Sequence, residues 1–106
     1  MKVFVSGPYT LGNKEKNVRQ AILTGEEIIK LGHTPFIPHL CHFWDKQSHH
    51  EYQYWIDYDL DWLESCDALL RIPGDSIGAD NEVKKALILH IPVYYSLAEL
   101  RDYWKK

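Results

Sequence analysis

Apolar and polar positions along the chain form two kinds of pattern, short apolar runs and longer segments with helical periodicity. The short runs predict strands at residues 2–6, 34–38, 67–72 and 92–95. The periodic segments predict helices at residues 14–31, 51–65, 79–90 and 97–104. Asn13 can cap the first of these helices and Gly32 can end it. Residues 39–50 and 73–77 are expected to be loops.

Strands that alternate with helices predict a parallel sheet with right-handed crossovers, and so an α/β fold. Four to five strands would form a small, doubly wound, Rossmann-like three-layer sandwich. Ligands of such folds bind beyond the carboxyl ends of the strands. Residues 7–13, 38–44 and 73–82 should meet there, so catalytic and binding groups are expected in these segments. The length of 106 residues predicts one domain over residues 1–106.

The charge balance argues against a long nucleic acid as the main partner. The chain carries 12 Lys and Arg against 15 Asp and Glu, a net charge of −3, whereas polyanion binding needs an excess of basic groups. No run reaches the roughly 18 apolar residues of a membrane span, and the first residues turn polar too soon for a signal peptide. Cys41 and Cys66 form no CxxC pair, which suits a reduced compartment. We therefore expect a cytoplasmic protein with no membrane partner.

Aromatic residues are unusually frequent, at 13% of the chain. A domain of this size has little interior for so many large rings, which predicts that some of them line a pocket or a subunit interface. Rings scattered over the surface are the alternative. The tryptophans in question are Trp44, Trp55, Trp62 and Trp104.

The loop after the first strand, residues 7–14, invites comparison with a phosphate-binding loop. It fails the pattern, because Asn13 stands where the motif requires Lys. The loop still leads into a helix N-terminus, which favours anions. The other interpretation, that its Gly, Pro and Asn residues only form a turn and a cap, stays open.

Two acidic residues are candidates for catalysis. Glu82 is expected in the first turn of the third helix, where the helix dipole favours the ionised form that a nucleophile needs. Asp59 shares a helical line with core residues, and burial of a carboxyl raises its pKa, as a general acid requires. Each could instead be purely structural, Glu82 as a first-turn acid and Asp59 as a partner of backbone groups. Two carboxyl groups converging on one pocket suggest glycosyl chemistry.

His and Cys residues gather in the segment after the second strand. They are His39, Cys41, His42, His49 and His50. Their spacing matches no regular zinc pattern, so a metal-binding protein is only a minor alternative, and we expect neither a metal nor a cofactor. Neutral His side chains could instead hydrogen-bond a ligand.

Three blocks of sequence resemble the nucleoside 2-deoxyribosyltransferase-like superfamily, in particular its small DUF4406-type branch. They are VFVSGPY at residues 3–9, DLDWLESCDA at residues 59–68 and SIGADNEV at residues 76–83. The blocks lie in the expected order and extend over nearly the whole domain. The last of them, Ser-x-Gly-x-x-x-Glu, is the most specific.

The resemblance implies a flavodoxin-like parallel sheet and cleavage or transfer at the N-glycosidic bond of a (deoxy)nucleoside or nucleoside 5′-monophosphate. Glu82 would be the nucleophile that forms a glycosyl-enzyme intermediate at C1′. Asp59 would contact the base and help protonate it as it leaves. Ser76 corresponds to a position that helps hold a phosphate in related hydrolases. Gly7, with Pro8 after it, and Gly78 would let the backbone approach the sugar and phosphate.

The chain departs from the family pattern at two places. Phe4 stands where the family has a Tyr whose hydroxyl orients the nucleophile, and Tyr9 could supply a hydroxyl instead. Asp80 and Asn81 replace small or apolar residues, and an extra carboxylate would repel phosphate. Phe4 and Asp80 therefore favour the alternative function, a non-catalytic nucleotide-binding module of the same fold.

The resemblance also bears on the surroundings of the site. Sites in this family are often completed by a neighbouring subunit, so we expect a homo-oligomer, a dimer or tetramer, with a site near the interface. The base would be surrounded by His39, His42, Phe43 and Trp44, since rings stack on nucleobases. The expected partner is a small-molecule nucleoside or nucleotide.

Overall fold

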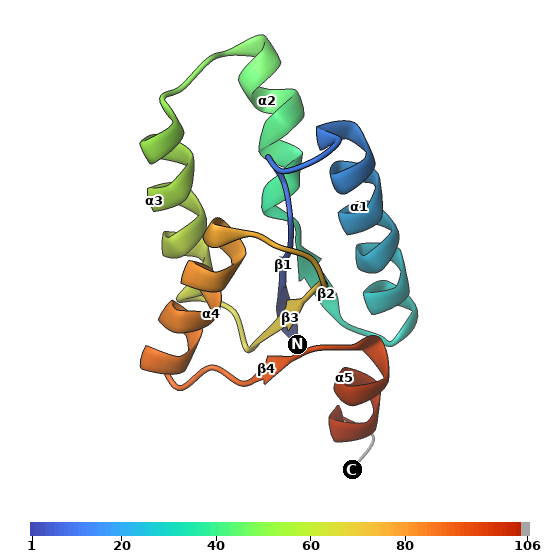
Figure 1. The fold of residues 1–106 in the computed structure, drawn as a ribbon. Coiled ribbons are helices and arrows are strands. Elements are labelled where there is room, and N and C mark those ends of the chain that lie inside the picture. The colour runs from blue at the N-terminus through green and yellow to red at the C-terminus, as the bar shows by residue number, and fades with distance from the viewer. Residues whose placement is uncertain (105–106) are drawn as a thin grey trace.

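The protein has an α/β fold built on a four-stranded parallel sheet. The computed structural model describes residues 1–104. The strands are β1 (Lys2–Ser6), β2 (Thr34–Phe36), β3 (Ala68–Arg71) and β4 (Val93–Tyr94), in the order β2-β1-β3-β4. The predicted Rossmann-like sandwich is confirmed (Figure 1).

Helices cover both faces of the sheet. The helices are α1 (Lys14–Lys30), α2 (Cys41–Gln47), α3 (Tyr52–Leu63), α4 (Ile77–Ile88) and α5 (Leu97–Trp104), with a short 3₁₀ helix at Pro38–Leu40. Figure 1 shows α1 and α5 on one side of the strands and α3 and α4 on the other. Within residues 1–104, no helix is long and apolar enough to cross a membrane.

The alternation of side chains along each strand divides the core into two layers. Val3 and Val5 face α1 and α5, where they pack with Ile28 and Leu100. Phe4 points the opposite way, into a layer with Leu63 of α3 and with residues of α4. Because side chains alternate with a period of two, Ser6 must share the direction of Phe4. The sheet therefore aims a polar side chain at α4 from the end of β1.

The segment at residues 39–50, expected to be a loop, is largely helical. It forms most of the 3₁₀ helix and all of α2, which lies beyond the end of β1 (Figure 1). No side chain of the described residues caps the N-terminus of α2, so its sequence lacks the signal that usually marks a helix start. Its end is held instead by the carboxylate of Asp45, which accepts hydrogen bonds from Trp55 of α3 and from the backbone of His50.

Candidate active site

The carboxyl ends of β1 and β3 bring two polar side chains to Glu82. Ser6 and Arg71 are register partners on these adjacent strands, and paired residues of a parallel sheet point to the same face. The hydroxyl of Ser6 donates a 2.7 Å hydrogen bond to Oε1 of Glu82. It also lies 3.4 Å from the carbonyl oxygen of Ala79. A strand end thus fixes the orientation of the Glu82 carboxyl.

Glu82 lies one turn further into its helix than expected. Ser76 caps α4 by accepting a 3.1 Å hydrogen bond from the backbone N–H of Ala79, so the helix begins at Ile77. This leaves Glu82 in the second turn, where the helix dipole acts weakly. Burial raises the pKa of Glu82 to about 7, while the hydrogen bond from Ser6 and the positive charge of Arg71 oppose that rise.

Asp59 is the second acid of the site and reaches it from α3. Burial raises the pKa of Asp59 to about 8, and the nearby negative charge of Glu82 adds to the increase. Its Oδ1 atom is buried and has no hydrogen-bond partner within residues 1–104. A buried carboxyl oxygen without a partner is costly in a folded protein, so a ligand that hydrogen-bonds it would gain stabilisation.

A cavity of about 290 Å³ lies beside Asp59. Its walls come from β2, the 3₁₀ helix, α2 and α3. It is lined by Pro35, Phe36, Ile37, Pro38, Leu40, Cys41, Trp44, Trp55, Tyr58 and Asp59. Trp44 and Trp55 meet edge to face, with ring centroids 5.4 Å apart. A mostly apolar, aromatic cavity with one protonated acid in its wall suits a planar heterocycle.

The other aromatic residues that were expected at a pocket or interface do not line this cavity within the described part of the structure. Trp62 does not line this cavity but stacks on Phe36 at its edge, at 5.4 Å between ring centroids. Phe43 is 53% exposed. The side chain of Trp104 lies outside the described part of the structure.

His39 and His42 are turned toward the loop after β1. Nε2 of His39 donates to the carbonyl oxygen of Pro8 at 3.0 Å, and burial lowers the pKa of this side chain. Nδ1 of His42 hydrogen-bonds the hydroxyl of Tyr9 at 3.1 Å. Tyr9 is thereby held by His42, and the hydroxyl that we expected it to give to Glu82 comes from Ser6. Nδ1 of His39 and Nε2 of His42 are buried without a partner within residues 1–104.

The remaining His residues of this segment form an ion pair, at His49, and a ring stack, at His50. Asp45 accepts from Nε1 of Trp55 at 2.8 Å and pairs with Nδ1 of His49 at 3.0 Å. The ring of His50 stacks on Tyr54. Within residues 1–104, no three His, Cys, Asp or Glu side chains form a group that could hold a metal ion.

The two glycines expected near the ligand have different surroundings. A Cβ atom on Gly7 would lie 2.9 Å from Cβ of Ile72, so this glycine allows β1 and β3 to pack closely at their ends. That contact gives Gly7 a packing role, and its expected role in ligand approach stays a prediction. A Cβ on Gly78 would meet, among the described residues, only Oγ of Ser76 at 4.0 Å. The space beside Gly78 is open.

Arg71 is a buried cation near the site that the sequence did not reveal. Its guanidinium is buried, donates to the carbonyl oxygens of Ile72 and Gly74, and pairs with Asp80 at 3.0 Å. Asp80, expected to repel a phosphate, instead neutralises this cation. The available signal was a basic residue at the end of an apolar strand, two residues after Leu69 and therefore on the same face of the sheet.

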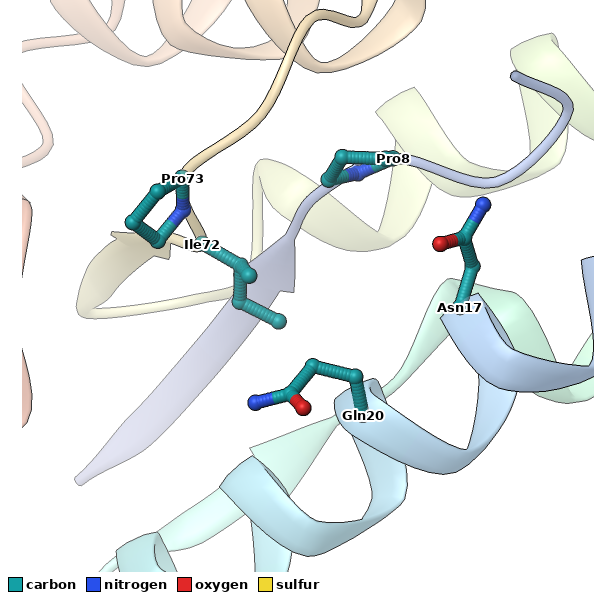
Figure 2. Close-up of a pocket in the computed structure, with 5 residues that line it drawn as sticks. All are labelled: Pro8, Asn17, Gln20, Ile72 and Pro73. Atoms are coloured by element: carbon teal, nitrogen blue, oxygen red, sulfur yellow. The ribbon is translucent and has the colours of Figure 1, made fainter. Parts of the chain in front are cut away.

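A second, smaller cavity lies on the α1 side of the strand ends (Figure 2). It has a volume of about 60 Å³ and is lined by Pro8, Asn17, Gln20, Ile72 and Pro73. This is room for about two water molecules and too little for a nucleoside. Nδ2 of Asn17 donates to the carbonyl oxygens of Tyr9 and Leu11, at 3.0 and 2.7 Å. Asn17 therefore holds the loop that carries Pro8.

Comparisons with known proteins agree with this architecture. A solved structure, described as a 2-deoxyribosyltransferase from the psychrotolerant bacterium Bacillus psychrosaccharolyticus, superposes with a TM-score of 0.65. It is 22% identical, and the match covers 88% of this chain and 69% of that one, which shows a common fold. No curated protein matches the sequence. The DUF4406 branch stays a prediction, because the matching family model is another one. That model, a domain of unknown function named DUF7768, matches residues 1–96, and the chain belongs to this family.

Proposed function

We propose that this protein cleaves the N-glycosidic bond of a (deoxy)nucleoside or nucleoside 5′-monophosphate and passes the sugar to water or to a second base. The observation that carries the proposal is the pair of partly buried acids, with a pKa of about 7 for Glu82 and about 8 for Asp59. Environments that separate the pKa values of two acids divide the roles of nucleophile and general acid between them. The likeness in fold to a 2-deoxyribosyltransferase supports this assignment.

The reaction follows from these protonation states. Because the pKa of Glu82 is the lower of the two, Glu82 is the acid that ionises first as pH rises, and Asp59 is the acid that keeps its proton to higher pH. Because Ser6 holds Oε1 of Glu82, we assign the attack on C1′ to Oε2. The C1′–N bond breaks, its electron pair goes to the base, and the proton of Asp59 goes to a nitrogen of that base. Water or a second base then attacks C1′, returns a proton to Asp59 and releases the Glu82 carboxylate.

The cavity beside Asp59 is the proposed base site. Its volume of about 290 Å³ is at the lower limit of small-molecule sites, which suits a base whose sugar extends toward Glu82. The open space at Gly78 and the hydroxyl of Ser76 support a sugar or 5′-phosphate on that side. The unpartnered Nδ1 of His39 could accept a hydrogen bond from a sugar hydroxyl, and the unpartnered Nε2 of His42 could form another.

The protein is also proposed to be a homo-oligomer with the site near its interface. The support is the family resemblance, together with exposed rings on α2 and α3 beside the cavity, where Trp44 is 49% and Tyr54 is 45% exposed. Sedimentation equilibrium of the purified protein tests this. A monomer at micromolar concentration would contradict it.

The decisive experiment is a substrate panel. Purified protein is incubated with ribo- and deoxynucleosides and their 5′-monophosphates, with and without a second free base, and released base is measured by chromatography. Glu82→Gln should abolish release, and Asp59→Asn should slow it strongly. Glu26→Gln and Asp61→Asn, which remove exposed acids, are the matched controls and should leave it unchanged.

Each outcome of the panel has a clear meaning. Release that needs an added base identifies a transferase, and release without one a hydrolase. Wild-type activity in Glu82→Gln would refute the mechanism. Absence of turnover together with thermal stabilisation by a nucleotide would replace the enzyme with a nucleotide-binding module.

A further inference from the structure

Arg71 is a buried cation on the strand next to Ser6, and the proposed reaction does not use it. Its guanidinium side chain is only 9% exposed, whereas that of its partner Asp80 is 65% exposed. An arginine stays charged in proteins, so this site holds a permanent positive charge beside a carboxyl group that must ionise. The charge of Arg71 acts on Glu82 in the direction that favours the anion.

We propose that Arg71 is a positioning residue of this site: Arg71 holds Glu82 as an anion and fixes the start of α4. Asp80 limits the effect of the Arg71 charge. This inference rests on the proposed function, since it assigns to Arg71 and Asp80 the control of the proposed nucleophile.

The hydrogen bonds of Arg71 fix the start of α4. The guanidinium spans the loop between β3 and α4, because it donates to the carbonyl oxygens of Ile72 and Gly74 and to Oδ1 of Asp80. Asp80 lies in the first turn of α4, two residues before Glu82. Three contacts from one rigid, planar group therefore fix the beginning of α4 against the end of β3. A lysine could keep the charge but could not reproduce these contacts.

Arg71 also acts on Glu82 through its charge. The hydroxyl of Ser6 on β1 and the cation of Arg71 on β3 both act on Glu82, and Glu82 in turn raises the pKa of Asp59 on α3. Farther along α4, Lys85 is engaged with Glu64 at 3.6 Å. Arg71 is thus a cation whose charge acts on Glu82, and Asp80 is the anion paired with it.

This arrangement makes two substitutions act in opposite directions. Arg71→Met removes the cation and should raise the pKa of Glu82. Asp80→Asn removes the opposing anion while Arg71 keeps its loop contacts, and it should lower that pKa. A residue that served only to hold the loop would not give opposite shifts.

The experiment measures the pKa of Glu82 in two independent ways. The first is the acid limb of the pH–rate profile. The second needs no activity and is the pH dependence of unfolding stability, compared between each variant and the same variant carrying Glu82→Gln. Asp75→Asn, which removes an exposed acid from the same loop, is the matched control, and Arg71→Lys separates charge from geometry.

The expected shifts are sizeable. Arg71→Met should raise the pKa of Glu82 by about one unit, which lowers the ionised fraction at pH 7 about fivefold. Asp80→Asn should lower it by about half a unit, and Asp75→Asn should leave it in place. Arg71→Lys should keep the pKa close to that of the wild type while it lowers kcat, because the charge remains and the contacts to the loop are lost.

Shifts of the same sign in Arg71→Met and Asp80→Asn, or no shift in either, would overturn the inference. If Arg71→Met does not fold, Asp80→Asn and Arg71→Lys decide. A protein without measurable turnover would refute the proposed function, while the stability measurement would still test the effect of Arg71 on Glu82.

Discussion

The hydroxyl of Ser6 donates a 2.7 Å hydrogen bond to Oε1 of Glu82 and so joins the end of β1 to the second turn of α4. The two residues are 76 positions apart in the sequence. Phe4, where the family resemblance leads us to expect a tyrosine, is buried against Phe36 at 5.5 Å between ring centroids. The hydroxyl that reaches Glu82 belongs to Ser6, two residues along the same strand and on the same face of the sheet.

Ser6→Ala should raise the pKa of Glu82 and move the acid limb of the pH–rate profile to higher pH. A hydrogen bond to a charged group contributes about 1.5–3 kcal/mol, so kcat/KM at pH 7 should fall about tenfold or more. Tyr9→Phe is the control, because its hydroxyl bonds His42, and it should leave the acid limb in place. A shift in Tyr9→Phe but none in Ser6→Ala would return the orienting role to Tyr9.

Asp59→Asn should stabilise the protein at alkaline pH. The pKa of Asp59 is about 8 in the folded chain and about 4 when unfolded. Between these values the folded state holds a proton that the unfolded state has lost, so stability falls as pH rises through this window and levels off above it. The variant should be more stable than the wild type at pH 8, by more than about 1.4 kcal/mol.

Urea unfolding at pH 4, 6 and 8 measures this effect. The advantage of Asp59→Asn should shrink toward pH 4, because the unfolded state also begins to bind the proton there. Asp61→Asn, on the exposed side of the same helix, should show no such trend. A stability difference independent of pH would mean that Asp59 is not a protonated buried acid.

Gly78→Ala should separate stability from activity. Gly78 lies in the first turn of α4 with open space beside it, so alanine should stabilise the helix by about 0.5–1 kcal/mol. The added methyl group would occupy the space proposed for the sugar or phosphate, and kcat/KM should fall. Gly7→Ala should instead destabilise the fold, because its methyl group would collide with Ile72. Thermal denaturation and the base-release assay together check both variants.

Asp45→Asn should weaken the connection between α2 and α3. Hydrogen bonds from the backbone of His50 and from Trp55 and His49 hold the pKa of Asp45 well below its usual range. This stabilisation is present above the pKa of an unfolded aspartate, about 4, and is lost as pH falls below it. The variant should therefore melt at a lower temperature than the wild type at pH 7, with a smaller difference near pH 3. Equal melting temperatures at pH 7 would show that the contacts of Asp45 contribute nothing to stability.

Much of the fold could be predicted because its signals are local. Each strand is a short apolar run, and α1 carries its own cap at Asn13, whose side chain accepts from the backbone of Lys16. The last helix was predicted at residues 97–104 and is observed at Leu97–Trp104. In contrast, α2 was missed because it depends on contacts with α3 rather than on a cap or an apolar stripe.

The candidate site was only partly predictable for a similar reason. Asp59 was suspected because a carboxyl group on an apolar helical line is a local anomaly. Ser6 and Arg71 were missed because each is an ordinary polar residue at a strand end. Their importance arises from the pairing of β1 with β3 and from the approach of α4. A pattern along the chain does not contain those contacts.

The cavity beside Asp59 gives the protein a built-in optical reporter. Two of the protein's four tryptophans, Trp44 and Trp55, line that cavity and contact each other in the cavity wall. Indole emission responds to stacking and to the loss of neighbouring water, so a bound heterocycle should change the intrinsic fluorescence without any added label. Occupancy could then be titrated even in Glu82→Gln, where no product forms.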